Sequence, residues 1–375
     1  MAEDNTNEIL TFRDLKKEVH LKGLCGKCGG CVSFCSAGDL NALRIGQNGL
    51  PEFVDEEKCV ECGICYLICP ETNVLNTDLV EKFSWKAPIG RWRNLTSART
   101  TDQKLHARAT DGGVVTSLLL YALKKGIING ALVSKRTGPF SRQPIIATTP
   151  EEIKESAGTF FEESSHLEEV GDIYTTYSPT IYEIKVLEKS TLERLAIVGT
   201  PCQINTISKM QVLGVLPSNS FTLTIGLFCV ENFSFDQQAR KKLEKTLKVN
   251  LDKVKKLNIK DDVIITKDTG EKIHIPIDVV DQVARPACLA CSHFANDFAD
   301  IACGGLGSPD GYTTTVVRTE FGETVYNGAK LNGFLDELSF KTKKEQKIHK
   351  SKLLAKITSF NKMKKKRSKM VTQVA

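Results

Sequence analysis

Two cysteine bursts with identical spacing stand in the first seventy residues of the chain. In each burst three cysteines follow at intervals of three residues, and a fourth comes four residues later, which is the spacing of bacterial two-cluster ferredoxins. Three such thiolates can wrap one face of a 4Fe-4S cube, while the fourth points toward the neighbouring cube. The spacing therefore predicts two clusters with crossed ligand sets, namely Cys25, Cys28, Cys31 and Cys69 for the first and Cys59, Cys62, Cys65 and Cys35 for the second.

Zinc and disulfides are the alternatives for so many cysteines. A structural zinc site uses four ligands, typically as well-separated Cys-x2-Cys pairs, and two identical four-cysteine bursts do not fit that arrangement. The N-terminal residues are acidic and polar, without the basic start and apolar stretch of a secretory signal. Disulfides are therefore not expected, and the sequence predicts a cytoplasmic iron–sulfur protein.

Four further cysteines occur in the second half of the chain. Cys202 and Cys229 each follow an expected strand, and Cys288 and Cys291 form a Cys-x2-Cys pair. Strand ends of an α/β sheet meet at one rim, where ligands usually bind. From spacing alone these cysteines could either hold a third cluster or be ordinary buried cysteines. Cys303 is given no role.

Two kinds of domain are expected to position these residues. The cysteine bursts predict a small α+β ferredoxin-like domain over residues 1–80, followed by a linker at 81–106. Alternating strand and helix patterns predict a larger layered α/β domain over 107–338. Its expected elements are a helix at 114–123, strands at 131–134, 195–199 and 223–228, and a β-ribbon at 257–280 that turns at 268–270.

The basic residues are concentrated at the C-terminal end. Of the 51 lysines and arginines, thirteen lie in residues 341–375, which contain one acid, Glu345. The net charge is +6 for the chain, so the rest of the chain is acidic and no nucleic-acid-binding fold is indicated. Residues 339–375 are expected to form a charged helix or disordered tail that docks on a membrane or a partner, or stays solvated.

Several motifs together resemble one family. They are Asp111–Thr116, Gly199–Gln203, Gly226–Phe233, the Cys288–Cys291 pair, and Ala299–Ile301 leading to Gly307–Tyr312. Their order is similar to that of the beta subunits of coenzyme F420-reducing hydrogenase, F420-linked formate dehydrogenase and F420H2 dehydrogenase. The two cysteine bursts resemble the longer members of this family rather than the hydrogenase subunit.

The resemblance implies FAD, a cluster beside it and coenzyme F420 as substrate. It makes Cys202, Cys229, Cys288 and Cys291 the expected ligands of a third 4Fe-4S cluster. A glycine pair before a helix also offers backbone amides and a positive helix end to the FAD pyrophosphate. The residues expected to bind cofactors are Asp111, Gly112, Gly113, Val114, Thr116, Thr200, Pro201, Asn232 and Lys260.

F420 carries phosphate and glutamates, so basic side chains should hold it. Candidates are Lys135, Arg136, Lys260 and Arg318, although most such side chains are solvated surface. His166, His274 and His293 could donate protons, but a structural or surface role is the more common one. No catalytic side chain is assigned, because the cofactors supply the chemistry.

The resemblance therefore implies an F420-dependent oxidoreductase subunit. It would exchange hydride between F420 and FAD and relay single electrons through three clusters to partner subunits. Two alternatives remain open at this stage: a ferredoxin-dependent flavin reductase with another substrate, and an electron-wiring subunit without a substrate site. The basic tail adds the expectation of a peripheral contact with the inner face of a membrane.

Overall fold

The first part of the chain contains the two cysteine bursts. The computed structural model describes residues 9–37, 40–138, 141–158, 174–175, 180–189 and 191–374. Thr11 begins the first helix with a capping box that it shares with Asp14. The elements of this part are α1 (Phe12–Leu15), the π-helical turn η1 (Lys16–His20), α2 (Gly30–Ala37), the antiparallel hairpin β1 (Leu43–Ile45) and β2 (Pro51–Phe53), η2 (Glu56–Lys58), α3 (Ile64–Leu67) and α4 (Asn76–Lys82).

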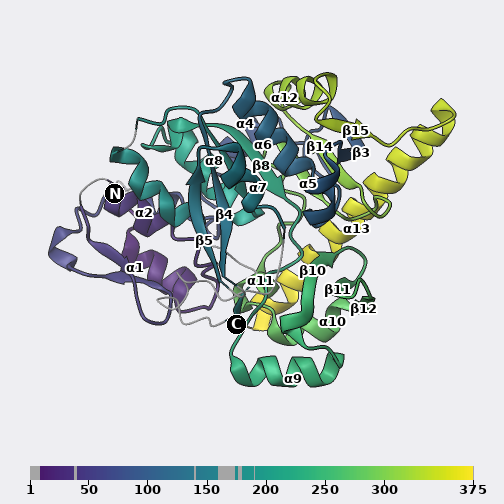
Figure 1. Cartoon of the computed structure of the whole chain (residues 1–375). Helices are drawn as coiled ribbons and strands as arrows, with labels where there is room; N and C mark the ends of the chain where they lie inside the picture. Colours follow the sequence, from purple (N-terminus) through teal and green to yellow (C-terminus); the bar gives the residue numbers. More distant parts are fainter. Residues whose placement is uncertain are drawn as a thin grey trace.

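An eight-stranded mixed sheet forms the centre of the larger part (Figure 1). Its strand order is β15-β3-β14-β13-β8-β7-β4-β5, and the four strands β13, β8, β7 and β4 are parallel. The strands are β3 (Asn94–Thr100), β4 (Gly130–Gly138), β5 (Ser141–Ala147), β7 (Leu195–Gly199), β8 (Phe221–Leu227), β13 (Ile301–Gly304), β14 (Thr313–Val317) and β15 (Leu335–Glu337).

Both faces of this sheet are covered, because successive side chains of a strand point to opposite sides. On one face Ala196 packs in a core with α6 (Val114–Lys124) and α12 (Glu320–Leu331). On the other face Leu195 and Ile197 pack in a core with α8 (Pro201–Val212) and the 3-10 helix η3 (Thr180–Lys189). The expected helix at 114–123 and the strands at 131–134, 195–199 and 223–228 are confirmed within a few residues.

A smaller region extends from the sheet between β8 and β13 and carries its own core around Phe233 and Val263. The expected ribbon is a three-stranded antiparallel sheet, and its turn at 268–270 is confirmed between β11 and β12. The elements are β9 (Ser234–Phe235), which pairs with β6 (Tyr174–Thr175), α9 (Gln237–Leu247), β10 (Val254–Ile259), β11 (Val263–Lys267), β12 (Lys272–Ile275), α10 (Ile277–Val280) and α11 (Pro286–Ala290); α5 (Gln103–Arg108) and α7 (Pro150–Glu155) flank the large sheet.

The linker expected at 81–106 is wrong over its second half. Strand β3 lies inside the eight-stranded sheet, hydrogen-bonded to β14 on one side and β15 on the other. Its sequence from Asn94 to Thr100 is rich in Thr, Ser and Asn, and so it lacks the apolar run that usually marks a central strand. Its burial comes from the neighbouring strands: Leu95 and Ala98 are fully buried.

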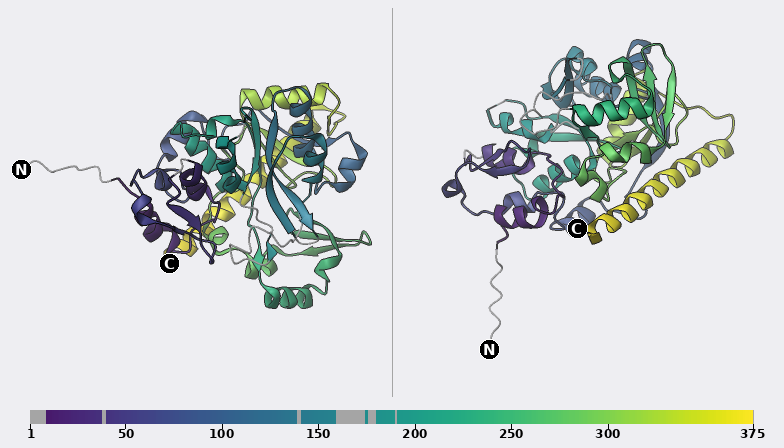
Figure 2. Two further views of the ribbon diagram at one scale, coloured as in Figure 1. Left: turned by 60° about the vertical axis from the view of Figure 1, so that its left-hand side comes forward. Right: turned by 90° about the horizontal axis from the view of Figure 1, so that it is seen from below.

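Of the two alternatives for residues 339–375, the charged helix is confirmed over Lys343–Val374, but it is neither a free tail nor fully solvated. Residues Lys343–Val374 form one long helix, α13, which packs on the sheet and runs toward the N-terminal part (Figure 2). Leu353 and Ile357 are fully buried in a core with Leu95, Ala302 and Val316. The apolar side chains of this helix therefore cover the chain's own sheet.

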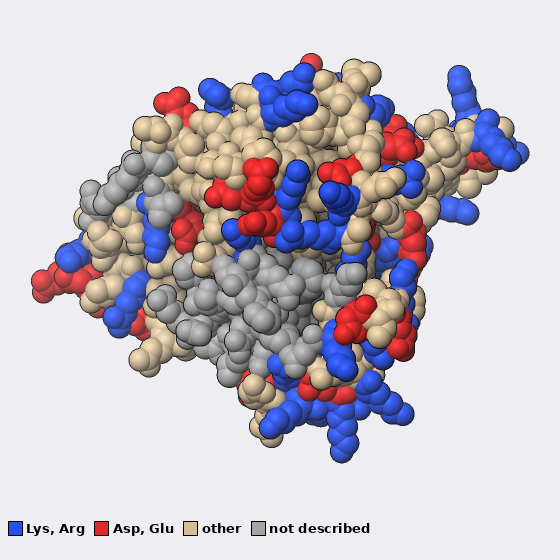
Figure 3. Space-filling view, viewed as in Figure 1, with Lys and Arg blue, Asp and Glu red and all other residues tan. Residues whose placement is uncertain are grey.

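The first turns of α13 project from the body with exposed lysines. Figure 3 shows these blue side chains at the right. A second group of basic side chains lies over α9 at the bottom of the same view. Among the described residues, no helix combines the length and the apolar character needed to cross a membrane.

Candidate functional site: two ferredoxin-type cysteine sets, a third set and a cavity

The two N-terminal cysteine sets come together in the crossed arrangement that the spacing predicts. Burial, with smaller contributions from the neighbouring Cys62, Cys59 and Cys35, raises the pKa of Cys65 to about 12. Likewise burial, followed by Cys28 and Cys25, raises the pKa of Cys69. Each fourth cysteine thus lies beside the three cysteines of the other burst. Cys62 is the exposed member of these sets.

The four later cysteines also come together, although they belong to separate elements. Cys202 is in the first turn of α8, Cys229 follows β8, and Cys288 and Cys291 lie in and after α11. Burial raises the pKa of Cys202, and Cys291 and Cys229 raise it further. Burial also raises the pKa of Cys229, and the neighbouring Cys288 and Cys291 contribute to that rise. The parallel strands β7 and β8 end at the same edge of the sheet, which brings Cys202 and Cys229 to one rim.

The four thiols suit an iron–sulfur cube. No three His, Cys, Asp or Glu side chains of the described residues are drawn together as a site for a single metal ion. A 4Fe-4S cluster instead binds one cysteine at each of four irons. Bound iron would remove the thiol protons and leave negative charge in a buried place. The cations Lys364 and Arg367 lie beside this set, and so the surroundings fit an anionic group.

The first and third cysteine sets adjoin one another. Thr206 of α8 donates its hydroxyl proton to the Cys202 carbonyl over 3.0 Å, and its oxygen lies 3.8 Å from Cys28 Sγ. Glu71 lies between the two sets, since its carboxylate acts on Cys69 as well as on Cys291. Burial raises the pKa of Glu71 to about 7, and Lys364 and Lys209 oppose this shift.

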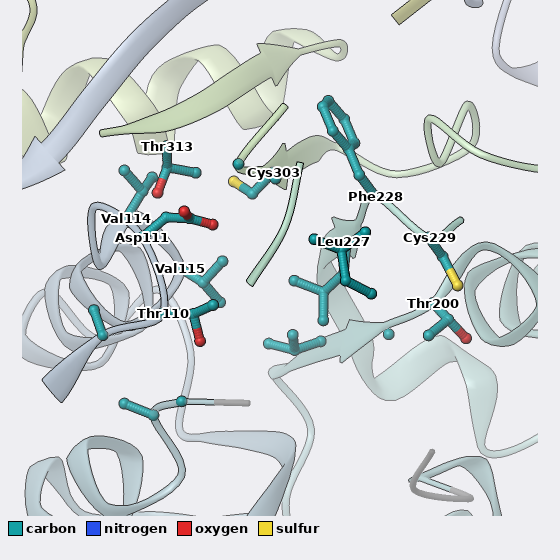
Figure 4. A pocket seen from close by; sticks show the side chains of 18 of the residues that line it. Thr110, Asp111, Val114, Val115, Thr200, Leu227, Phe228, Cys229, Cys303 and Thr313 are labelled. Carbon is teal, nitrogen blue, oxygen red and sulfur yellow. The ribbon is translucent and has the colours of Figure 1, made fainter. Parts of the chain in front are cut away.

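A cavity of about 310 Å³ opens at the same end of the sheet. That volume is at the low end of ligand pockets, which span roughly 300–1,000 Å³. Figure 4 shows Asp111, Val114 and Val115 on one side of it, and Thr200, Leu227, Phe228 and Cys229 on the other. The expected cofactor-binding residues that line this cavity are Asp111, Gly113, Val114, Thr116, Thr200, Asn232 and Lys260. Cys303, for which no role was expected, also lines it.

The N-terminus of α6 faces the cavity. Gly113 precedes α6 with φ of +73°, a conformation that favours glycine, and none of the described side chains caps the helix there. The amides of the first turn have no partner within a helix, and with the helix dipole they form a place for an anion. Gly113, Val114, Val115 and Thr116 all line the cavity, which supports the expected phosphate site.

Gly112 has a different role from the expected one. It does not line the cavity, and its N–H donates to Thr313 Oγ1 over 2.9 Å. A Cβ on Gly112 would lie 2.5 Å from the Ala98 carbonyl oxygen and 2.7 Å from the Thr313 nitrogen. Glycine is therefore needed at 112 because two strands pass close to it. Pro201 likewise does not line the cavity and stands in the first turn of α8.

Two cavity residues touch the third cysteine set directly. The Thr200 hydroxyl lies 3.1 Å from Cys202 Sγ, and Asn232 Nδ2 donates to Cys229 Sγ over 3.4 Å. Both side chains are therefore shared between the cavity wall and the cysteines. A ligand in the cavity would lie next to whatever those four thiols hold.

Acidic and basic groups meet at the opposite wall. Asp111 accepts a hydrogen bond from Asn258 Nδ2 over 2.9 Å, and Lys260 Nζ lies 3.9 Å from its carboxylate and 3.1 Å from that of Asp310. Burial raises the pKa of Asp111, and Lys260 opposes that shift. Lys260 is thus the one expected basic candidate that the described cavity wall contains.

The other basic candidates and the histidines lie elsewhere or outside the description. Lys135 pairs with Glu155 over 2.6 Å. Arg318 is buried and donates to the carbonyls of Ile89, Arg91 and Ala295, so it is structural. His274 is exposed and pairs with Asp262. His293 donates its backbone N–H to Cys291 Sγ over 3.4 Å, while His166 and the side chain of Arg136 lie outside the described residues.

Two buried lysines beside the cysteines were missed from the sequence. Lys209 of α8 donates to the carbonyls of Cys69 and Thr72 over 2.6 and 2.8 Å. Lys364 of α13 donates to the Cys229 carbonyl over 3.2 Å. A signal existed for Lys364, because it continues the stripe of Leu353, Ile357 and Phe360 at helical spacing.

Comparisons with known proteins show the family of this chain. Residues 192–343 match the C-terminal domain, and residues 95–170 the N-terminal domain, of the family described as coenzyme F420 hydrogenase/dehydrogenase, beta subunit. Residues 52–71 match a 4Fe-4S binding domain. The chain belongs to the coenzyme F420 hydrogenase/dehydrogenase beta subunit family. It is an F420-linked oxidoreductase subunit with 4Fe-4S binding.

Relatives differ in how much of the chain they match. The beta subunit of the coenzyme F420 hydrogenase of Methanothermobacter thermautotrophicus is 30% identical over 66% of this chain and 85% of that protein. A subunit of the F(420)H(2) dehydrogenase of Methanosarcina mazei is 27% identical over 83% of each chain. A chain of the F420-reducing [NiFe] hydrogenase complex from Methanosarcina barkeri matches with a TM-score of 0.61 and 26% identity, over 74% of this chain and 93% of that chain.

Proposed function

We propose that this chain exchanges hydride between coenzyme F420 and FAD, and passes electrons singly through three 4Fe-4S clusters to partner subunits. The observation that carries the proposal is the shared wall: Thr200 and Asn232 line the cavity and also contact Cys202 and Cys229. Bound FAD supplies the change between two-electron hydride transfer and one-electron transfer.

The residues of the cavity have separable tasks in this proposal. The first turn of α6 receives the pyrophosphate at Gly113, where the backbone amides and the helix dipole favour negative charge. Asp111 is held by Asn258 and Lys260, and its carboxylate would accept hydrogen bonds from hydroxyl groups of the ligand rather than meet a phosphate. Lys260 lies at the edge of the cavity, where its charge attracts the acidic substrate.

The ligands of the three clusters follow from the way the cysteines are grouped. Cys202, Cys229, Cys288 and Cys291 hold the cluster beside the cavity. The set with Cys25, Cys28, Cys31 and Cys69 adjoins it through Thr206, and the set with Cys59, Cys62, Cys65 and Cys35 lies beyond that. Cys62 is exposed, so a partner subunit would receive or deliver electrons on that side.

The length of the matches supports a member with its own ferredoxin segment. The F420H2 dehydrogenase subunit aligns with 83% of the chain, against 66% for the hydrogenase beta subunit. The exposed lysines at the start of α13 remain available for contact with a membrane or partner subunit.

Anaerobic titration of the purified chain with reduced F420 tests the proposal. The expected result is bound FAD that bleaches on addition of the reduced substrate, with about twelve irons per chain. Bound flavin that reduced F420 does not bleach would indicate another substrate. A chain that takes up no flavin would be an electron-wiring subunit, and the proposal would be wrong.

A further inference from the structure

The C-terminal helix places a buried ammonium group against the third cysteine set. Leu353, Ile357 and Phe360 fix the helix on the body, and the Phe360 ring lies 5.4 Å from that of Phe294. One turn further on, Lys364 is only 1% exposed and donates to the Cys229 carbonyl over 3.2 Å. A lysine is almost never this buried unless negative charge faces it.

Lys364 lies beside three cysteines of this set, namely Cys229, Cys288 and Cys291. Its ammonium group is hydrogen-bonded to the main chain of Cys229, and the Glu71 carboxylate lies nearby, between Lys364 and Lys209. A cluster bound by the four thiolates would supply the negative charge that a buried ammonium group needs.

Arg367, one turn along the same helix, ties the strand end and α11 together. Its guanidinium donates to Glu231 Oε2 over 2.6 Å, to the Val230 carbonyl over 3.3 Å and to the Cys288 carbonyl over 3.2 Å. Glu231 is thereby paired with Arg367, whereas the ammonium group of Lys364 lies against the cysteines. The two side chains thus have different tasks: Arg367 holds the backbone that carries Cys229 and Cys288, and Lys364 brings positive charge to their thiols.

A second buried lysine repeats the arrangement at the first cysteine set. Lys209 is fully buried and donates to the Cys69 carbonyl, as Lys364 does to the Cys229 carbonyl. The two lysines come from α8 and α13, and each approaches the main chain of a ligand cysteine. A charge held by hydrogen bonds in a place of low dielectric acts strongly on a neighbouring redox group.

We propose that Lys364 of α13 is a positioning residue that raises the reduction potential of the cluster held by Cys202, Cys229, Cys288 and Cys291. The inference rests on the proposed function for the presence of that cluster. A fixed positive charge stabilises the form that has gained an electron, so removing the charge makes reduction harder. The basic C-terminal helix is then part of the redox centre.

Three variants of the full chain test this. Lys364→Met keeps the length of the side chain without its charge, Lys364→Arg keeps the charge, and Lys362→Met removes an exposed lysine of the same helix. Iron content and EPR spectra at fixed potentials are measured for each. At the potential where the wild-type cluster is half reduced, Lys364→Met should lower the reduced-to-oxidised ratio about tenfold, which corresponds to 59 mV. Lys364→Arg and Lys362→Met should stay near the wild type.

Each other outcome has a defined meaning. Loss of about four irons in Lys364→Met but not in Lys364→Arg would support a need for the charge. An unchanged potential with full iron in Lys364→Met would overturn the inference, as would loss of those irons in both variants. About eight irons in the wild type would instead refute the third cluster itself, and with it the proposed function in its present form.

Discussion

The two N-terminal cysteine sets and the third set are assembled by different routes. In the first case eight cysteines lie within 45 residues of chain, and a repeated local spacing brings them together. In the third set Cys202, Cys229 and the Cys288–Cys291 pair depend on the ends of β7 and β8, on α11 and on a helix from the C-terminal end. The ligands of the N-terminal sets therefore come from one short segment, although α8 contributes Thr206 and Lys209 beside the first set, whereas the third set draws its ligands from three separate parts of the chain.

Removal of α13 should separate the two cases most strongly. We expect a chain that ends at Leu338 to lose the third cluster, so that about eight of about twelve irons remain. The truncation exposes the surface that Leu353 and Ile357 cover and removes Lys364 and Arg367 from the cysteines. Burying one such aliphatic side chain contributes about 1.5–3 kcal/mol. Iron analysis and thermal unfolding measure both effects.

A chain that ends at Lys369 is the matched control, because it keeps both cations and the buried stripe of α13. It should retain the full iron content. If the chain ending at Leu338 also retained the full iron content, α13 would not be needed for the third cluster, and the contrast between the two regions would fail.

Single ligand replacements in the two regions should have reciprocal effects. Cys288→Ser should remove about four irons, leave the EPR signals of the N-terminal clusters in place and block onward transfer from the flavin. Cys62→Ser should leave flavin reduction by reduced F420 intact and slow transfer to an external acceptor. Stopped-flow absorbance follows both steps. If Cys62→Ser abolished flavin reduction while FAD stayed bound, the proposed order of the sites would be wrong.

The FAD site can be tested separately from the clusters at Gly113. Gly113→Asp places a carboxylate at the helix end where phosphate is expected, so FAD content should fall at least tenfold while iron is unchanged. Gly126→Asp is the matched control, because Gly126 follows the same helix with φ of +65° and has open space around it. Both variants carry the cost of a left-handed backbone, but only the first lies at the cavity. Equal FAD content in the two would remove the phosphate site from α6.

Acidification should affect the ferredoxin part through His20, and this effect is the smallest. Burial, with a smaller contribution from Lys16, lowers the pKa of His20 to about 4. Unfolding then takes up a proton below the usual pKa of 6.5, and stability is lost as the pH falls from 6.5 toward 4. At pH 5 the loss is at most about 2 kcal/mol. Urea unfolding at pH 7 and pH 5 should show a smaller change in the free energy of unfolding for His20→Gln than for the wild type. An equal change in both proteins would contradict the role given to His20.

The sequence could predict what depends on neighbours along the chain. Cysteine spacing indicated the crossed sets, and apolar patterns indicated α6, β7 and β8. Strand β3 was missed because Asn94, Thr96 and Ser97 carry no apolar signal, and its burial comes from β14 and β15. Gly112 was assigned to phosphate, whereas the structure shows that its neighbours Ala98 and Thr313 require glycine.

The C-terminal helix shows what a local sequence pattern leaves undetermined. Its thirteen basic residues were visible, and so were the apolar residues between them. A pattern with period 3.6 specifies that one face is buried, but not which surface buries it. Only the position of α13 on the sheet revealed that the buried face is internal and that Lys364 belongs to it.

The sequence by itself determined how the eight N-terminal cysteines are grouped, because ligands held within one short loop need only the local backbone to meet a cluster. The tertiary structure decided which charges surround the third cysteine set. Lys364 stands 135 residues from the Cys229 carbonyl that it contacts. A buried charge is stable only where the folded chain brings opposite charges next to it. Contacts between residues so far apart in the chain cannot be inferred from a local sequence pattern.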